Sequence, residues 1–440
     1  MTEASTSAPS AVAPESAPPP DKFPPAVAGT IDWLEARFAR HYREHPPEMP
    51  DRFTRREFGF ILWPDKPGPP PFIRHRGYTE KEKFHWYLGK RGPHSVYYST
   101  AYYRHPAERM MVDKEWMGAE LIFDLDADHL EEAEAAKARG EEMPLEEQLR
   151  IVKQQFQYLL DEFLFGDFGL DEKDVFLTFS GGRGYHAHVT DPRLLDLDAK
   201  GRREIVDYVT AKVPAAKGTD QPDLSPFLWQ NKQRVGDGPY AKVKQMLAGA
   251  PATSPGWPGR MTRMLANELE SNVLNADPHE AEAWLTGFKG IGAKGAATFV
   301  QKFEEKKLDR IRDGAFGLDN QGVYSKLIHV LLKRSALALG KGETDEPVTA
   351  DVKRLIRLPG SLHGKTGLNV VTLRADELKD FDPFRDATVF GDETVRMVPR
   401  FDQELTLAGV RVKVSAGEEV EVPVNHAVFW CARQQGTIVR

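Results

Sequence analysis

Alternation of apolar and acidic residues in the run 119–126 (AELIFDLD) restricts the architecture more than any other part of the sequence. In a β-strand, its leucines and phenylalanine would fill one face, while Asp124 and Asp126 would project from the other. Two carboxylates about 6–7 Å apart along a strand can hold one or two hard divalent cations. The run therefore predicts a buried strand with a metal-binding face, and a solvated strand face is the simpler alternative.

The composition fits a globular protein without disulfides. Of the 440 residues, 40% are hydrophobic and 28% are charged, and no apolar run is long enough to span a membrane. The single cysteine, Cys431, excludes an intramolecular disulfide and a zinc ribbon built on thiolates. The net charge of −7 is unlike that of a basic nucleic-acid coat, but local clusters of positive charge can still bind DNA or RNA. We expect a cytoplasmic protein with no membrane association.

Helical and strand-like patterns divide the chain into a core and an insertion. Residues 1–28 are mostly Ala, Pro and Ser and are expected to be a disordered tail. Residues 202–339 are mostly helical in pattern, whereas short strand-like runs alternate with helices on both sides. The pattern therefore predicts one mixed core of helices and strands, built from residues 29–201 and 340–440, with residues 202–339 as an inserted helical subdomain.

A glycine-rich turn, residues 180–186 (SGGRGYH), follows a β-rich run. Glycines such as Gly182 allow the backbone to approach an anion and expose N–H groups to it. Arg183 offers a bidentate fork for phosphate, and His186 offers a further donor. We expect a triphosphate here, although the spacing is not that of a P-loop, and the alternative is a tight hairpin with one exposed arginine. His188, two positions further on, is interpreted as structural.

A basic segment in the last quarter of the chain is the third candidate. Residues 345–367 (DEPVTADVKRLIRLPGSLHGKTG) contain Arg357 and His363 among several cations around a Pro-Gly turn. These side chains are expected to converge on a polyphosphate or a template, and Asp345 is a candidate third metal ligand. An ordinary basic loop is the alternative for this segment alone. Carboxylates for metals, a phosphate-binding turn and a cationic clamp together indicate phosphoryl or nucleotidyl transfer.

These motifs resemble the small, catalytic subunit of the archaeal and eukaryotic DNA primase. The similar runs are STAYYRHP and GAELIFDLDADHL around the acidic strand, SGGRGYHAHV, and VTADVKRLIRLPGSLHGKTGL, and the resemblance extends from about residue 31 to the C-terminus. It implies that the catalytic, metal-binding carboxylates are Asp124, Asp126 and Asp345. It also implies a set of residues that hold the triphosphate of the incoming nucleotide: Ser180, Gly182, Arg183, His186, Arg357, His363 and Arg56.

The resemblance further implies the fold, the cofactors and the partners. The fold would be α+β, in which an RRM-like mixed sheet, the primase palm, carries the aspartates and a helical subdomain is attached. Mg²⁺ or Mn²⁺ would be the cofactor for joining NTPs or dNTPs on a single-stranded DNA template. A larger primase subunit would complete a heterodimer that makes primers for DNA replication. Many archaeal relatives carry a Cys/His zinc site after the catalytic strand, but residues 130–150 hold no cysteine, so no zinc is expected here.

Three other functions remain open from the sequence alone. A primase-polymerase of DNA repair or translesion synthesis would extend primers rather than start them. A phosphatase of the haloacid-dehalogenase type would use the first aspartate as a nucleophile, but that family has Gly-Thr where this chain has Ala127-Asp128. A non-catalytic nucleic-acid-binding protein would not need Asp124. The long third motif and the end-to-end resemblance favour the replicative primase subunit over the repair polymerase. The presence of all three carboxylates and of the phosphate-binding residues argues against a non-catalytic relative.

Overall fold

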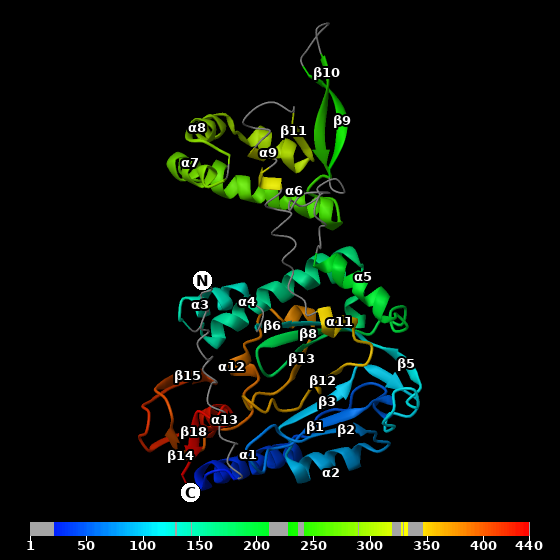
Figure 1. Ribbon diagram of the computed structural model, residues 1–440, viewed down its shortest axis with the longest axis vertical. Helices are drawn as coiled ribbons and strands as arrows, with labels where there is room; N and C mark the ends of the chain where they lie inside the picture. The colour runs from blue at the N-terminus through cyan, green and yellow to red at the C-terminus, as the bar shows by residue number, and fades with distance from the viewer. Residues whose placement is uncertain are drawn as a thin grey trace, which may run out of the picture.

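Two parts of the chain, a larger body and a smaller lobe, are distinguishable in the computed structural model (Figure 1). The structure describes residues 22–127, 130–141, 143–210, 228–235, 242–288, 290–318, 327–328, 330–332 and 346–439. The body contains the N-terminal and the C-terminal segments, and the lobe is built from residues between them. Helices and antiparallel sheets make up both parts, so the expected α+β class is confirmed.

The first sheet of the body has four antiparallel strands. Its strands and the helices beside it are α1 (Pro25–Glu44), β1 (Phe58–Ile61), β2 (Phe72–Arg76), α2 (Lys81–Arg91), β3 (Ser95–Ser99) and β12 (Leu355–Arg357). The strand order is β12-β3-β1-β2, and α1 and α2 pack on each other along this sheet (Figure 1). Phe58 and Phe60 of β1 are fully buried against Phe84 of α2. The alternate residues of β1 therefore form the core between the sheet and α2.

Helix α1 begins at Pro25, inside the segment expected to be a disordered tail. Proline suits the first turn of a helix because its φ is already helical and its missing N–H would have no intrahelical partner. Leu34, Phe38 and Tyr42 are buried on one face, as the helical spacing of apolar residues predicts. Residues 1–21 lie outside the described part of the chain.

The second sheet of the body carries the two aspartates of the acidic strand. Its strands and the nearby helices are β6 (Leu121–Asp126), α3 (Glu131–Ala138), α4 (Leu145–Tyr158), the π-helical segment η3 (Leu159–Asp167), β7 (Val175–Phe179), β8 (Gly184–Val189) and β13 (Val371–Leu373). The order is β13-β7-β8-β6, antiparallel throughout. Phe156 of α4 stacks on Tyr185 of β8 with ring centroids 5.6 Å apart. Since side chains alternate along a strand, His186 and the paired Asp124 project from the opposite face.

The lobe contains a sheet that the helical pattern of residues 202–339 does not predict. Its elements are β9 (Leu228–Val235), β10 (Lys242–Gly249), α6 (Gly256–Leu269), α7 (Pro278–Thr286), α8 (Ala293–Lys302), α9 (Glu305–Arg312) and β11 (Ala315–Leu318). Strands β9 and β10 pair along their whole length, and β11 adds to β10. Lysine and glutamine recur in β9 and β10 and favour helices in isolation, so strand pairing outweighs local propensity here.

Helix α6 attaches the lobe to the body. Arg260 of α6 is buried and forms an ion pair of 2.7 Å with Asp167, at the end of η3. Trp257 Nε1 donates a hydrogen bond of 2.7 Å to the carbonyl of Tyr208, in helix α5 (Ala199–Val209). A buried arginine with a carboxylate partner is costly to separate, so this contact holds α6 against the body.

The C-terminal segment completes the body beside α1. The remaining described strands and α-helices of the body are β4 (Ala101–Tyr103), β5 (Trp116–Ala119), α11 (Glu346–Ala350), α12 (Pro383–Asp386), β14 (Thr394–Pro399), β15 (Gln403–Leu407), β16 (Val410–Val414), β17 (Val420–Pro423), α13 (Val424–Ala432) and β18 (Gly436–Ile438). The backbone N–H of Ile438 in β18 donates a hydrogen bond of 2.9 Å to Thr30 Oγ1 of α1, which joins the last strand to the first helix. Among the described residues, no helix is both long and apolar enough to cross a membrane.

Candidate active site

A cavity of about 410 Å³ lies where the two sheets of the body meet. Its walls come from β3 and β12 of the first sheet, from β6 and β8 of the second, and from the turns after β7 and β12. The structure brings eight residues predicted from the sequence into this lining: Asp124, Asp126, Ser180, Gly182, Arg183, His186, Arg357 and His363. Tertiary folding therefore gathers all three sequence motifs around one cavity.

Both carboxylates of β6 reach the cavity. Antiparallel pairing places Asp124 opposite His186 and Asp126 opposite Gly184. His186 Nε2 lies 3.5 Å from Asp124 Oδ1, and Arg183 Nε lies 3.8 Å from Asp126 Oδ1. The aspartate side chains are 17% and 38% exposed, respectively, so a ligand in the cavity can contact either one.

The donor set of these aspartates fits a hard divalent cation. Two carboxylates on one face of a strand supply the oxygen ligands that Mg²⁺ and Mn²⁺ prefer. The third expected carboxylate, Asp345, lies outside the described residues. Within the residues that the structure does describe, no group of three or more His, Cys, Asp or Glu side chains is placed to hold a metal ion.

The turn between β7 and β8 packs directly against His363. Gly181 has a φ of +74°, a conformation that favours glycine. A Cβ atom on Gly182 would lie 2.9 Å from His363 Nε2, so a larger residue would displace the imidazole. Ser180 Oγ accepts hydrogen bonds from the backbone N–H groups of Gly182 (3.3 Å) and Gly184 (3.2 Å). The serine therefore shapes the turn, and the glycines keep it close to His363.

Arg357 and His363 bring the C-terminal motif to the cavity. The guanidinium carbon of Arg357 lies 5.2 Å from the ring centroid of Tyr97. Arg357 Nη1 is buried and has no hydrogen-bond partner among the described residues, which suits an anion entering the cavity. Burial, together with the charge of Arg357, lowers the pKa of His363 well below its usual value, so the imidazole is neutral at pH 7. His363 Nδ1 lies 3.1 Å from Thr366 Oγ1, which fixes the ring orientation.

Positive charge dominates the lining of the cavity. Five cationic side chains face the two carboxylates: Arg183, Arg354, Arg357, Lys365 and Arg433. An excess of positive charge in a cleft favours a polyanion such as a triphosphate. Two of the lining residues, Tyr97 and Arg433, lie outside all three sequence motifs. Tyr97 reaches Arg357 only through the pairing of β3 with β12, and Arg433 follows α13, far from any motif, so neither carried a sequence signal.

Comparison of the sequence with known proteins indicates the family of this chain, independently of the geometry of the cavity. The chain matches the family described as DNA primase small subunit over residues 123–375. It is 39% identical to the DNA primase small subunit PriS of Methanothrix thermoacetophila over 407 residues, covering 92% of this chain and 98% of that protein. The chain belongs to the DNA primase small subunit family. The family resemblance inferred from the motifs is therefore confirmed.

Further archaeal members of the primase family match over similar lengths. The PriS proteins of Methanococcoides burtonii and Methanocella arvoryzae are each 35% identical to this chain, over 91% and 92% of its length. The aligned regions include 96% and 97% of the lengths of these two relatives, respectively. The match to the primase family over residues 123–375 includes all eight expected residues that line the cavity.

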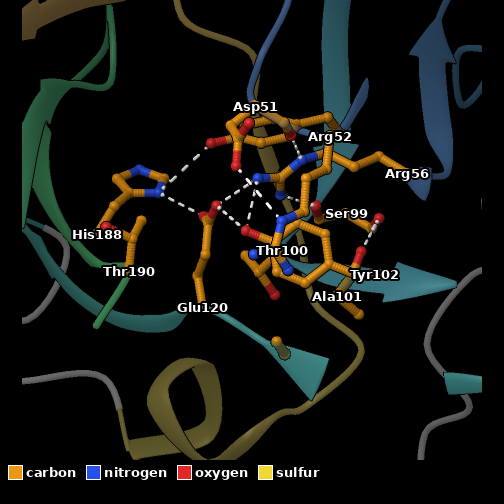
Figure 2. Close-up of polar contacts among 12 residues, drawn as sticks. Asp51, Arg52, Arg56, Ser99, Thr100, Ala101, Tyr102, Glu120, His188 and Thr190 are labelled. Carbon is orange, nitrogen blue, oxygen red and sulfur yellow. Dashed lines mark hydrogen bonds and ion pairs between the residues drawn. The ribbon is translucent and has the colours of Figure 1, made fainter. Parts of the chain in front are cut away.

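In this member of the primase family, Arg56 does not reach the cavity, in contrast to the expectation from the resemblance. Arg56 is 1% exposed and forms an ion pair with the equally buried Glu120 (Figure 2). It also donates hydrogen bonds of 2.7 Å to the carbonyl oxygens of Ser99 and Asp51, and it lies over the Tyr98 ring. Because its donors and its charge are satisfied inside the protein, Arg56 is not available to a triphosphate.

A buried chain of polar side chains links this ion pair to the cavity. Figure 2 shows Glu120 between Arg56 and His188, and Glu120 Oε2 lies 3.3 Å from His188 Nδ1. His188 Nε2 lies 3.4 Å from Thr178 Oγ1, which in turn lies 3.1 Å from His186 Nδ1. The Thr178 hydroxyl therefore bridges two imidazoles and orients His186 with Nε2 toward the carboxylates. His188, interpreted as structural from the sequence, occupies the middle of this chain.

Proposed function

We propose that this chain is the catalytic subunit of a DNA primase, which joins nucleoside triphosphates into short primers on single-stranded DNA for replication. The observation that carries the proposal is the convergence of Asp124 and Asp126 with the glycine turn and the cationic motif around one cavity, in a member of the primase family. Nucleotidyl transfer needs these parts: metal-binding carboxylates, a cradle for phosphates, and positive charge near the leaving pyrophosphate.

The cationic and imidazole side chains are assigned to the triphosphate. Arg183 can form a bidentate contact with phosphate, and Arg357 can offer the buried Nη1 that lacks a partner among the described residues. His186 and His363 present ring nitrogens to the same cavity. Held by these groups, the nucleotide would place its α-phosphorus in line with the 3′-hydroxyl of the growing primer.

Mg²⁺ or Mn²⁺ is the proposed cofactor, held by Asp124 and Asp126. The carboxylates share one face of β6 and both reach the cavity, and Asp345, outside the described residues, is expected to complete the set. Bound there, divalent cations would lower the pKa of the attacking hydroxyl and neutralise charge on the triphosphate. The aspartates face the cavity because alternate side chains of the same sheet pack under α4.

The proposed palm is the sheet β13-β7-β8-β6. Its four antiparallel strands, with α4 on one face and the aspartates on the other, support an RRM-like palm. The relatives are named small subunits, so we expect a larger primase subunit to complete a heterodimer with this chain. The template would be read by base pairing with the incoming NTP or dNTP, so the protein need not recognise a DNA sequence.

Synthesis without a primer tests the proposed function. The full chain, alone and with the larger subunit, is incubated with single-stranded DNA, labelled NTPs or dNTPs, and Mg²⁺ or Mn²⁺. New oligonucleotides that depend on the template and on the metal are the expected result. Extension of a supplied primer without initiation, even with the larger subunit, would favour a primase-polymerase of repair. Absence of synthesis in both formats would contradict nucleotidyl transfer.

Removal of the Thr178 hydroxyl tests how His186 is positioned. Thr178→Val keeps the shape of the side chain but removes the bridge between the two imidazoles. We expect the KM for the nucleotide to rise about 2- to 10-fold, because one hydrogen bond contributes about 0.5–1.5 kcal/mol. Steady-state primer extension at saturating template separates this change in KM from any change in kcat.

Thr178→Ser is the matched control, because it restores the hydroxyl. Its KM for the nucleotide should return close to that of the wild type, while thermal unfolding shows that all three proteins are folded. If the valine and serine variants have the same KM, the bridge does not position His186.

A further inference from the structure

Four side chains form a continuous row across the first sheet, from the cavity to the edge strand β2. The guanidinium carbon of Arg357 on β12 lies 5.2 Å from the ring centroid of Tyr97 on β3. The ring centroids of Tyr97 and Phe72 are 5.9 Å apart, with an angle of 61° between the ring planes. The guanidinium carbon of Arg74 lies 5.8 Å from the centroid of Phe72. We call Arg357, Tyr97, Phe72 and Arg74 the aromatic row.

Gly59 of β1 allows the two rings of the aromatic row to meet. Strand β1 lies between β3 and β2, and Gly59 is the residue paired with Tyr97. A Cβ atom on Gly59 would lie 3.1 Å from Phe72 Cε2 and 3.1 Å from Leu355 Cδ1, closer than ordinary van der Waals contact. Because the middle strand has no side chain at this point, Phe72 reaches across it to Tyr97.

The aromatic row leads out of the cavity into solvent. Arg357 and Tyr97 belong to the lining of the cavity, whereas Phe72 and Arg74 lie beyond that lining. Phe72 is 50% exposed, and the Arg74 side chain is 38% exposed. One exposed phenylalanine is ordinary on a protein surface. Here, however, the exposed ring continues a series of side chains in contact that begins beside the carboxylates, with the edge of one ring meeting the face of the other.

Positive charge accompanies the exposed end of the aromatic row. Arg74 Nε lies 3.1 Å from Glu57 Oε1, and the Lys114 amine lies 3.3 Å from Glu57 Oε2. Two cations share one carboxylate, so this group keeps a net positive charge. The cavity end of the row carries its own excess of cations. Both ends of the row therefore attract a negatively charged strand.

We propose that the aromatic row is a stacking platform for the single-stranded DNA template, extending from the catalytic cavity to β2. Every base has a π face that can stack on an exposed aromatic ring, and the partly exposed Arg74 beside Phe72 can contact a phosphate. Such a platform accepts any sequence, as a template strand requires. The inference rests on the proposed function and adds the surface along which the template lies.

Binding of a fluorescent oligothymidylate to the full chain, measured by anisotropy without nucleotide or metal, tests the platform. Phe72→Ala is expected to weaken binding about 5- to 100-fold, the range associated with the loss of one base–aromatic stack. Phe72→Trp keeps an aromatic face and should retain most of the affinity. Phe401→Ala is the matched control, since Phe401 is 60% exposed and lies outside both the aromatic row and the cavity lining, and it should bind like the wild type.

Kinetics of primer synthesis with the same variants distinguish a defect in template binding on the platform from a defect in nucleotide binding in the catalytic cavity. For Phe72→Ala, the KM for the template should rise while the KM for the nucleotide stays unchanged. Wild-type affinity of Phe72→Ala for oligothymidylate would overturn the platform, even if the wild type makes primers. Loss of binding to the larger subunit with unchanged DNA affinity would also overturn it and would identify a protein-docking surface. Failure of the wild type to make primers, with stacking on Phe72 intact, would instead contradict the proposed function alone.

Discussion

Replacing Asp124 by asparagine is expected to lower nucleotide incorporation at least ~10²-fold. The change removes a negative charge from the pair of carboxylates proposed to hold the metal ions, while it keeps the size of the side chain. Charge stabilisation by a bound metal is worth several kcal/mol in the transition state, and each ~1.4 kcal/mol corresponds to a factor of ten. Single-turnover incorporation on a primed template measures the effect. Asp126→Asn should behave in the same way, because both carboxylates project into one cavity.

An exposed aspartate outside the cavity lining provides the control for this experiment. Asp376 is 70% exposed and pairs with Arg374 on the surface, so Asp376→Asn should keep wild-type activity. Calorimetry of Mn²⁺ binding in the presence of nucleotide should show weaker binding for Asp124→Asn and Asp126→Asn only. Full activity of either cavity variant would rule out the assignment of that aspartate as a metal ligand.

Replacing Glu120 by glutamine is expected to lower the free energy of unfolding by about 3–5 kcal/mol. The substitution leaves the guanidinium of Arg56 buried without its counter-ion, since both side chains are 1% exposed. The carbonyl groups of Ser99 and Asp51 still accept hydrogen bonds from Arg56, but they do not neutralise its charge. Unfolding in urea, followed by circular dichroism, measures the loss.

Glu419→Gln is the matched control for Glu120→Gln. Glu419 pairs with Arg396 at 2.7 Å, but these side chains are 47% and 60% exposed. A solvent-exposed ion pair contributes at most about 1 kcal/mol, so this variant should unfold close to the wild type. Equal losses of stability in the two variants would show that burial of the Arg56–Glu120 pair is not the cause.

The same buried pair predicts how stability depends on acid pH. Burial alone would raise the pKa of Glu120, but Arg56 and His188 lower it from 4.5 to about 2. A carboxylate whose pKa is lowered by folding stabilises the folded state fully at pH values above its pKa in the unfolded state. This stabilisation is lost as the pH falls through its pKa in the folded state. The wild type should therefore lose roughly 3 kcal/mol between pH 4.5 and pH 2 from this group. Glu120→Gln should not show this loss of unfolding free energy between pH 4.5 and pH 2. If the unfolding free energies of the two proteins change in parallel with pH, Glu120 is not the cause of the acid sensitivity.

Local patterns in the sequence were sufficient for the strands and helices that bury one face. The acidic strand, the strands on either side of the glycine turn, and the first helix all follow from their apolar spacing. The pairing of β9 with β10 did not follow, because lysine and glutamine favour helices and the two runs lack the alternating apolar pattern of a strand. Their structure depends on strand pairing, which no single window of sequence contains.

The sequence alone was sufficient to identify the residues of the candidate site, because each motif is a short run whose residue types indicate its chemistry. Two aspartates on one strand face, a glycine turn and a basic loop can be recognised without knowing how they meet. Their convergence on one cavity was decided by the tertiary structure, through the pairing of β6 with β8 and of β3 with β12. The tertiary structure also determined which arginine lines the cavity: Arg357 reaches it through the pairing of β12 with β3, whereas Arg56 is held elsewhere by its ion pair with Glu120. It also brought Tyr97 and Phe72 together across Gly59, because contacts between strands depend on register, and register is set only when the whole sheet forms.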